Sequence, residues 1–381
     1  MEVFFFHPEE YDRLYNCSAY SIDQIPLEKR QHILIGVIFL SIGIICEVLY
    51  IPCMIAIRKH MDNTCYKFMF YISIMDMLCL TLNAITTGIL AICGAVFCTS
   101  PRFIYIAGAF GLSLWGCETV AEMSLALNRC LELAWSRVAR VLFHGKQIYL
   151  WMLFPTVYGL YFLIFTKPII FSGMYITWFF NPHIGYINDY EIIYRNDLHA
   201  VHNYIVIIVL SSTYLTFAMI FFVQGRQFKT LSTDTGTVYQ KQVFIQVILI
   251  SSSNAIAAAI CVFMNFVSLS EFLIILGQFC WIMAHGLPPI IYLLLNKTVR
   301  RDVYIMLVRH LAVMFPWITV PPELSSTLAC VNVGQCDHVE LTDDGSVLLM
   351  PTFAPPHLRP PHLRPYICAL HTGKKLETRG L

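Results

Sequence analysis

Seven long apolar segments separated by short polar stretches dominate the pattern of hydrophobic and polar positions along the chain. A helix needs roughly 20 apolar residues to cross about 30 Å of hydrocarbon, and each segment is long enough. A segment in lipid must satisfy its own backbone hydrogen bonds, so helices are expected rather than strands. The predicted spans are 33–57, 68–93, 103–127, 148–171, 201–223, 243–267 and 272–295. The pattern therefore predicts an all-α membrane protein, a bundle of seven transmembrane helices over residues 33–295.

The third segment is the least hydrophobic because two glutamates interrupt it. Five residues follow one another at spacings of 4, 3, 4 and 7 and so share one helical face: Gly111, Trp115, Glu118, Glu122 and Arg129. Lipid would penalise both carboxylates. This face is therefore predicted to point into the bundle.

The composition agrees with a membrane protein. Hydrophobic residues make up 57% of the chain and charged residues 13%, about half of the ~25% that soluble domains carry. A net charge of +1 gives no argument for nucleic-acid binding. Half of the fourteen cysteines lie inside apolar runs, where a thiol behaves as a small hydrophobe. The chain is therefore not expected to be a disulfide scaffold.

The orientation follows from lysine and arginine, which favour the cytoplasmic side. With the N-terminus outside, fourteen basic residues fall in or beside the inner loops and six fall outside. Asn16-Cys17-Ser18 is a glycosylation acceptor that works only on the lumenal side. Residues 1–32 are accordingly predicted to be extracellular, with Asn16 glycosylated.

Two segments follow the seventh span. Residues 296–315 place apolar side chains at helical spacing with arginines on another face, which predicts a short amphipathic helix along the inner membrane surface. Residues 316–381 are rich in proline and contain PHLRP twice, at 356–360 and 361–365. This composition predicts a disordered cytoplasmic tail.

Ionisable residues inside a span cost about 2.5–3.5 kcal/mol each on insertion scales, so each is a functional candidate. Asp76, Glu118 and His285 are predicted to meet inside the bundle. They either satisfy one another or bound water as a packed core, or take part in switching. A zinc hydrolase would need several histidines at one depth. Only His285 lies well inside a span, so neither a metal nor a cofactor is expected.

Three short sequences resemble landmarks of rhodopsin-like receptors in order, spacing and depth. YISIMDMLCL at 71–80 places Asp76 among apolar residues, as in the second helix of those receptors. LNRCLEL at 127–133 resembles the Asp/Glu-Arg-Tyr motif, and PPIIY at 288–292 resembles Asn-Pro-x-x-Tyr. The resemblance implies a role in G-protein coupling and switching for Asn128, Arg129, Pro289 and Tyr292.

A longer resemblance, over roughly residues 30–312, is to nematode serpentine chemoreceptors of class T. The similar stretches are LYIPCM (49–54), CYKFMFYISIMDM (65–77), GAVFC (94–98), LNRCLEL and GLPPIIYLLLNKTVR (286–300). This resemblance implies a rhodopsin-like seven-helix receptor fold, a chemosensory role and a heterotrimeric G-protein partner. It also implies the plasma membrane as location, with a sensory-neuron cilium as a candidate site.

The sequence departs from rhodopsin-like receptors at several positions. Asn128 replaces the acidic residue that helps restrain the neighbouring arginine, and Pro288 stands where those receptors have asparagine. The usual outer disulfide is absent, because residues 172–200 contain no cysteine. The outer cysteines Cys17 and Cys98 either pair with each other or remain free thiols.

The resulting hypothesis is a G-protein-coupled chemosensory receptor for an external small molecule, not an enzyme. Depth and inward-facing position nominate four ligand-binding residues, although each could be an ordinary packed residue: Trp115, Tyr214, Gln278 and Trp281. The alternative is a transporter or ligand-gated channel. Transporters commonly have internal repeats and broken helices, whereas this chain shows no repeat and only 286–289 offers a Gly/Pro break.

The second-helix aspartate of rhodopsin-like receptors helps to hold a sodium ion, and Asp76 occupies the similar position. Two adjacent carboxylates in low dielectric cannot both ionise cheaply. His285 could supply the compensating positive charge, which favours a proton-sensitive site over a sodium site.

Overall fold

The computed structural model describes residues 1–18, 21–185, 193–228, 235–264, 270–315, 338–341 and 347–350. Residues 1–303 form one compact unit, and the chain from Tyr304 onward forms a second. The elements in chain order are α1 (Glu2–Phe6), α2 (Pro8–Leu14), η1 (Ile22–Gln24), α3 (Leu27–Arg30), α4 (Ile33–Arg58), α5 (Thr64–Leu80), η2 (Thr81–Thr86), α6 (Thr87–Cys93), η3 (Phe97–Thr99), α7 (Pro101–Ala134), α8 (Ser136–Phe143), α9 (Gln147–Phe165), β1 (Ile170–Ser172), β2 (Thr177–Phe179), α10 (Asp197–Phe228), α11 (Thr235–Phe263), α12 (Glu271–Leu295), α13 (Lys297–Met314), β3 (His338–Leu341) and β4 (Val347–Met350).

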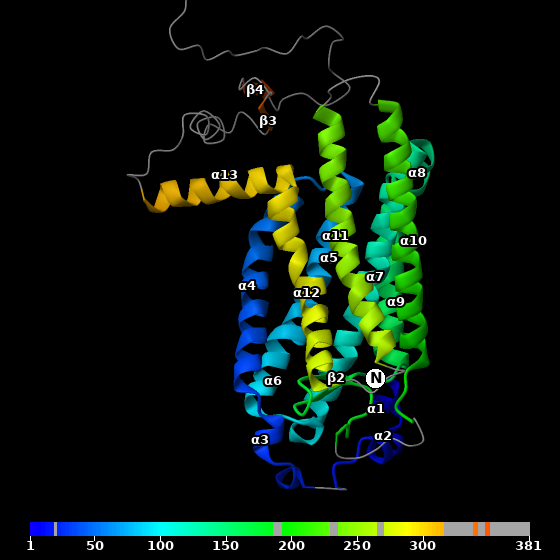
Figure 1. Ribbon diagram of the computed structural model, residues 1–381, viewed down its shortest axis with the longest axis vertical. Coiled ribbons are helices and arrows are strands. Elements are labelled where there is room, and N and C mark those ends of the chain that lie inside the picture. The colour runs from blue at the N-terminus through cyan, green and yellow to red at the C-terminus, as the bar shows by residue number, and fades with distance from the viewer. Residues whose placement is uncertain are drawn as a thin grey trace, which may run out of the picture. The chain divides into compact units, whose positions relative to one another are not determined.

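Long helices lying side by side make up the first unit (Figure 1). Six described helical stretches are long and apolar enough to cross a membrane: Leu27–Arg58, Thr64–Cys93, Pro101–Ala134, Gln147–Phe165, Asp197–Ile220 and Glu271–Leu295. Within α11, residues Ile248–Phe263 form a shorter apolar helix. These stretches match the seven predicted spans in order and position.

The third long helix, α7, is the centre of the bundle. It packs against α5, α9 and α10. In its most apolar 18-residue stretch 78% of the residues are buried, compared with 22% in α9. Burial inside protein rather than in lipid explains why this span tolerates two glutamates.

Two ends of the first unit can be distinguished in Figure 1. The hairpin end holds α1–α3, η3 and the strands β1 and β2, and the α8 end holds α8 and the connection between α4 and α5. β1 and β2 pair antiparallel, with Ile170 opposite Phe179 and Ser172 opposite Thr177. The three short helices α1–α3 within residues 1–32 and this hairpin were not predicted from the sequence.

The second span is not one regular helix. Between α5 and α6 the chain forms the π-helix η2, which shifts the later residues around the helix axis. Asn83, in η2, is fully buried and turned toward α12. Gly94 then ends α6 with a φ of 64°, in the left-handed region that glycine adopts without strain.

Boundaries differ most from prediction at the fourth span. Helix α9 ends at Phe165, and the last residues of the predicted span at 148–171 lead into β1 instead. Pro168 lies between the two elements and cannot continue a helix. Residues 265–267, the predicted end of the sixth span, lie outside the described residues.

Helix α13 corresponds to the amphipathic helix predicted over 296–315. Its first turns belong to the first unit, where Val299 and Val303 pack beside Tyr292. In the second unit, β3 and β4 form an antiparallel pair with His338 opposite Met350. The rest of the tail predicted to be disordered, 316–337, 342–346 and 351–381, lies outside the described residues.

Candidate functional site

A buried polar centre joins three helices of the bundle. Nδ1 of His285 on α12 lies 2.8 Å from Oδ1 of Asp76 on α5. The Tyr50 hydroxyl on α4 donates to Oδ2 of Asp76 at 2.7 Å and to the His285 carbonyl at 2.9 Å. The other ring nitrogen, Nε2 of His285, lies 3.2 Å from Sγ of Cys79. All four side chains are fully buried, so these contacts are shielded from water.

Two glutamates of α7 face the same centre. Asn254 on α11 donates an amide hydrogen to Oε1 of Glu118 at 2.8 Å. Oε2 of Glu118 and both carboxylate oxygens of Glu122 are buried without a hydrogen-bond partner among the described residues. The side chains are only 1% and 2% exposed. Leaving a buried polar atom unpaired costs about 1–3 kcal/mol, and more for a charged group.

The structure therefore brings the predicted trio together. Asp76, Glu118 and His285 each offer a ligand atom, and these atoms all lie within 4.8 Å of one another. The trio comes from α5, α7 and α12, which are far apart in the sequence. Oε2 of Glu118 is the one carboxylate oxygen of the trio without a hydrogen-bond partner among the described residues.

Two of the four predicted ligand residues, Trp115 and Trp281, lie next to this centre, and a third, Gln278, contacts the β1–β2 hairpin. The Trp115 ring meets the His285 ring edge to face, with centroids 5.8 Å apart, and its Nε1 donates to Oδ1 of Asn203. The Trp281 ring centroid lies 6.5 Å from that of His285. Gln278 donates to the carbonyl of Asn83 at 2.8 Å. The side chain of Tyr214 lies outside the described part of α10.

The β1–β2 hairpin covers these residues. Thr177 in β2 donates its hydroxyl to Oε1 of Gln278 at 2.6 Å. Trp178 donates Nε1 to the Thr87 hydroxyl on α6 at 2.8 Å. Just before β1, the carbonyl oxygen of Ile169 lies so close to Gly108 of α7 that an added Cβ would sit 1.6 Å from it. These contacts hold the hairpin against α6, α7 and α12.

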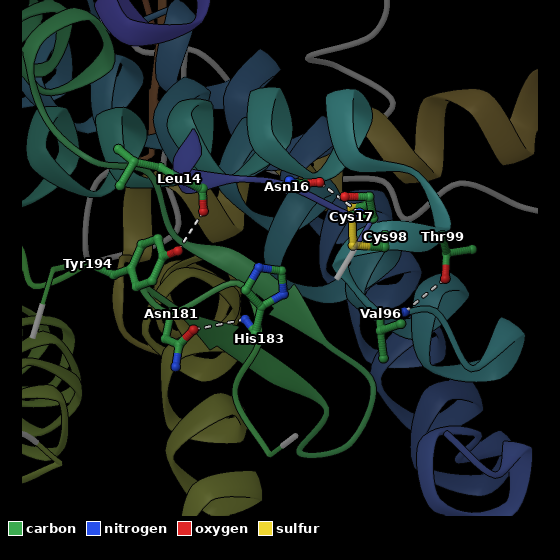
Figure 2. The surroundings of a disulfide bond; sticks show 10 residues. Leu14, Asn16, Cys17, Val96, Cys98, Thr99, Asn181, His183 and Tyr194 are labelled. Atoms are coloured by element: carbon green, nitrogen blue, oxygen red, sulfur yellow. Dashed lines mark hydrogen bonds between the residues drawn. A yellow bond between two sulfur atoms is a disulfide. The ribbon is translucent and has the colours of Figure 1, made fainter. Parts of the chain in front are cut away.

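A disulfide between Cys17 and Cys98 ties the N-terminal segment to η3, beside the hairpin (Figure 2). Figure 2 also shows the hydroxyl of Tyr194 donating to the Leu14 carbonyl, at 2.5 Å. His183 lies nearby, and burial lowers its pKa to about 4. Sequence reasoning had left open whether these two cysteines pair or stay free. The structure pairs them.

The predicted switch residues lie toward the α8 end. Nη1 of Arg129 is 2.8 Å from Oε2 of Glu132, one turn further along α7. Asn128 is fully buried, and neither of its amide atoms has a hydrogen-bond partner within the described residues. The Pro289 carbonyl on α12 accepts a weak hydrogen bond from the Cys53 thiol at 3.7 Å.

A cleft opens between the helices at this level. Tyr292, the fourth predicted switch residue, lines it together with Glu122. The remaining lining residues are Cys65, Met69, Ile72, Leu125, Ala126, Gln246, Ile250 and Ser251. The carboxylate of Glu122 therefore borders the cleft, and Glu118 lies one helical turn away on α7.

The two histidines that begin α10 serve as hydrogen-bond partners. The ring nitrogens of His202 lie 3.0 Å from the hydroxyls of Thr119 and Tyr158. His199 Nε2 lies 3.1 Å from the Asn203 amide. Neither belongs to a group of three or more potential metal ligands within the described residues.

Comparison with known proteins settles the family. Residues 1–313 match a family model described as serpentine type 7TM GPCR chemoreceptor Srt. The chain belongs to this family. It is also 25% identical to serpentine receptor class T-55 of Caenorhabditis elegans over 292 residues, which are 76% of this chain and 78% of that protein. Both the seven-helix fold and the class T resemblance are thereby confirmed.

The Srt family is one of receptors rather than enzymes, and this favours the receptor over the transporter or channel considered above. Sequence reasoning missed Tyr50, Cys79 and Asn254, which belong to the receptor's polar centre, and also Glu132, the ion-pair partner of Arg129. Glu132 could have been found, because it follows Arg129 by three residues and an i, i+3 pair meets on a helix surface. Asn254 directly follows three serines inside the sixth span. Such a polar run in an apolar span could also have indicated a polar contact inside the bundle.

Proposed function

We propose that this serpentine receptor binds an external small molecule at the hairpin end and signals to a cytoplasmic heterotrimeric G protein at the α8 end. One observation carries the proposal, namely a run of buried polar side chains that links the two ends. Thr177 contacts Gln278, and Gln278 contacts the backbone of Asn83. Asn83 in turn donates to the carbonyl of Trp281, one turn before His285.

The run continues from His285 toward the α8 end. One side-chain oxygen of Asp76 and one of Glu118 lie within 4.8 Å of a ring nitrogen of His285. Glu122 follows Glu118 one turn along α7. Glu122 and Tyr292 line the cleft at the α8 end. A ligand that shifts Gln278 relative to Asn83 would therefore change contacts made by α12, which also carries Tyr292. Such a ligand selects the helix arrangement that it binds better, and the cleft changes with it.

In the proposed orientation the receptor lies in the plasma membrane with its hairpin end outside the cell. The proposed location within sensory neurons is the cilium. The orientation is supported by the excess of basic residues in the loops at the α8 end. It is also supported by the disulfide at the hairpin end, because disulfides persist in oxidising compartments. Asn16 is exposed at the same end, as a glycosylation acceptor must be.

The test is a screen of volatile and water-soluble compounds on cells that carry the full-length receptor and a G-protein reporter. An activating compound is expected for the wild type, with potency reduced at least tenfold in Gln278→Ala. Gln147→Ala removes an exposed glutamine at the α8 end and is expected to leave potency unchanged. Ligand-evoked ion currents without G-protein activation would contradict the proposal and favour a channel.

A further inference from the structure

We propose that Asp76, Glu118 and His285 form a binding site for a transition-metal dication, of which Zn²⁺ is the best match. The proposal goes beyond signalling, since metal binding can be measured without a ligand or a G protein. The three ligands come from α5, α7 and α12. A bound ion would therefore cross-link three helices at the centre of the bundle.

The geometry is close to that of a metal site. The three ligand atoms lie within 4.8 Å of one another. Bonds of about 2.0–2.2 Å in tetrahedral geometry place ligand atoms about 3.3 Å apart. Asp76 Oδ1 and His285 Nδ1 are already at 2.8 Å, so they need to separate only slightly. Glu118 has the longest side chain of the three and can close the remaining distance by rotation.

A second, independent observation points to a bound cation. Oε2 of Glu118 is buried and has no hydrogen-bond partner among the described residues, although the side chain is only 1% exposed. An anionic oxygen in such surroundings is costly unless a positive group meets it. The described residues place no lysine or arginine among the buried polar side chains. A metal ion bound by all three ligands would satisfy this oxygen.

Each ligand is also oriented by a separate group that contacts its other atom. Tyr50 donates to Oδ2 of Asp76, and Asn254 donates to Oε1 of Glu118. Cys79 contacts Nε2 of His285. Each of the three ligands thus keeps one further oxygen or nitrogen that this outer partner does not occupy. Such outer partners fix the orientation of ligands in metal sites, and their loss typically costs tenfold or more in metal affinity.

The ligand types select the ion. Imidazole nitrogen suits zinc and its transition-metal neighbours, whereas calcium and magnesium prefer all-oxygen sites. Two carboxylates balance the charge of a dication, and the imidazole binds metal in its neutral form. The sequence analysis expected no metal and gave His285 the positive charge. In the proposed site that charge belongs to the ion.

The experiment uses the purified full-length receptor in a Cys93→Ser background, because Cys93 is an exposed free thiol that would itself bind zinc. Chelator-treated protein is titrated with Zn²⁺ in about 150 mM sodium chloride and again in choline chloride. One ion per chain is expected, with equal affinity in the two salts. Co²⁺ is expected to give absorption bands without a thiolate charge-transfer band, because Cys79 contacts His285 rather than the metal.

Variants then locate the site. Glu118→Gln and His285→Gln are expected to weaken Zn²⁺ binding at least tenfold, whereas Glu122→Gln, one turn away, changes it less than twofold. Thermal unfolding of each variant shows whether it is folded. The proposal is overturned if the Cys93→Ser receptor, in which all three ligands are intact, binds no stoichiometric Zn²⁺. It is also overturned if sodium competes, or if folded Glu118→Gln binds zinc as the wild type does.

Discussion

Arg129 and Glu132 form an ion pair one turn apart on α7, with 2.8 Å between Nη1 and Oε2. Rhodopsin-like receptors restrain the similar arginine through the residue before it, which here is Asn128 and cannot form an ion pair. The acidic partner lies on the other side of Arg129 in the sequence. The side chains of Arg129 and Glu132 are 14% and 38% exposed, so the pair lies at the edge of the buried region.

Glu132→Gln is expected to raise basal G-protein signalling, because it frees Arg129 from a partner that holds it within α7. A partly exposed pair is worth about 0.2–1 kcal/mol, which corresponds to a rise of about 1.4- to 5-fold. Reporter activity without ligand, normalised to surface expression, measures the effect. Asn128→Asp adds an acidic neighbour and should lower basal activity instead. Equal basal activity in wild type and Glu132→Gln would mean that the pair does not restrain the receptor.

Arg129→Ala is expected to abolish ligand-evoked signalling while leaving surface expression near that of the wild type. Arginine remains charged at every relevant pH and its planar group makes directed contacts, which suits it to a partner at the α8 end. Arg137 on α8 is an exposed arginine at the same end, so Arg137→Ala is the matched control and should signal normally. Undiminished signalling by Arg129→Ala would make this residue only a membrane anchor.

The disulfide should stabilise the receptor by restricting the unfolded chain. Cys17 and Cys98 are 81 residues apart, and removing such a cross-link typically costs about 2–4 kcal/mol. Cys17→Ser, Cys98→Ser and the double variant are expected to lower the unfolding temperature of the purified receptor by the same amount. Cys93→Ser, which removes a free thiol, is the control. Additive losses in the double variant would indicate that the two cysteines act separately.

Much of this fold could be predicted because membrane spans are encoded locally. A segment of about twenty apolar residues predicts a span from its own sequence, whatever residues contact it in the folded protein. The face of the third helix that carries Glu118 was also correctly assigned to the interior, because lipid excludes carboxylates. The meeting of Asp76 and His285 followed from motifs at similar depth.

The remainder depended on tertiary contacts that leave little trace in sequence. The β1 and β2 strands have three residues each, and the apolar residues before them were read as the end of the fourth span. Pro168 was the available signal, because the residue before a proline disfavours helix. Tyr50 gave no signal, since its hydroxyl is one polar atom in an apolar segment and its partners are 26 and 235 residues away.

The orientation can be tested through Asn16. This residue is exposed beside the disulfide, and its side chain accepts a hydrogen bond from the Ser18 backbone at 2.7 Å. Glycosidase treatment is expected to increase the gel mobility of the wild type but not of Asn16→Gln. A tag at residue 381 should be stained only in permeabilised cells. Staining of that tag on intact cells would contradict the proposed orientation.

The last prediction concerns pH and His183, which follows β2 at the hairpin end. The side chain is 7% exposed, its ring meets Phe97 edge to face, and burial lowers its pKa to about 4. In the unfolded chain a histidine binds its proton near pH 6.5. As the pH falls from 6.5 toward 4, His183 becomes protonated in the unfolded state but stays neutral in the folded state. Stability attributable to His183 is therefore complete above pH 6.5 and decreases below it.

At pH 5 this loss should amount to about 1–2 kcal/mol of unfolding free energy relative to pH 7.5. His183→Gln keeps the backbone N–H that donates to Asn181 but has no titrating side chain. The variant should therefore lose less stability than the wild type when the pH is lowered. His144→Gln removes an exposed histidine at the α8 end and should behave as the wild type does. Unfolding temperatures at the two pH values measure the difference, and an identical pH dependence in wild type and His183→Gln would show that the buried ring accepts its proton without unfolding the hairpin end.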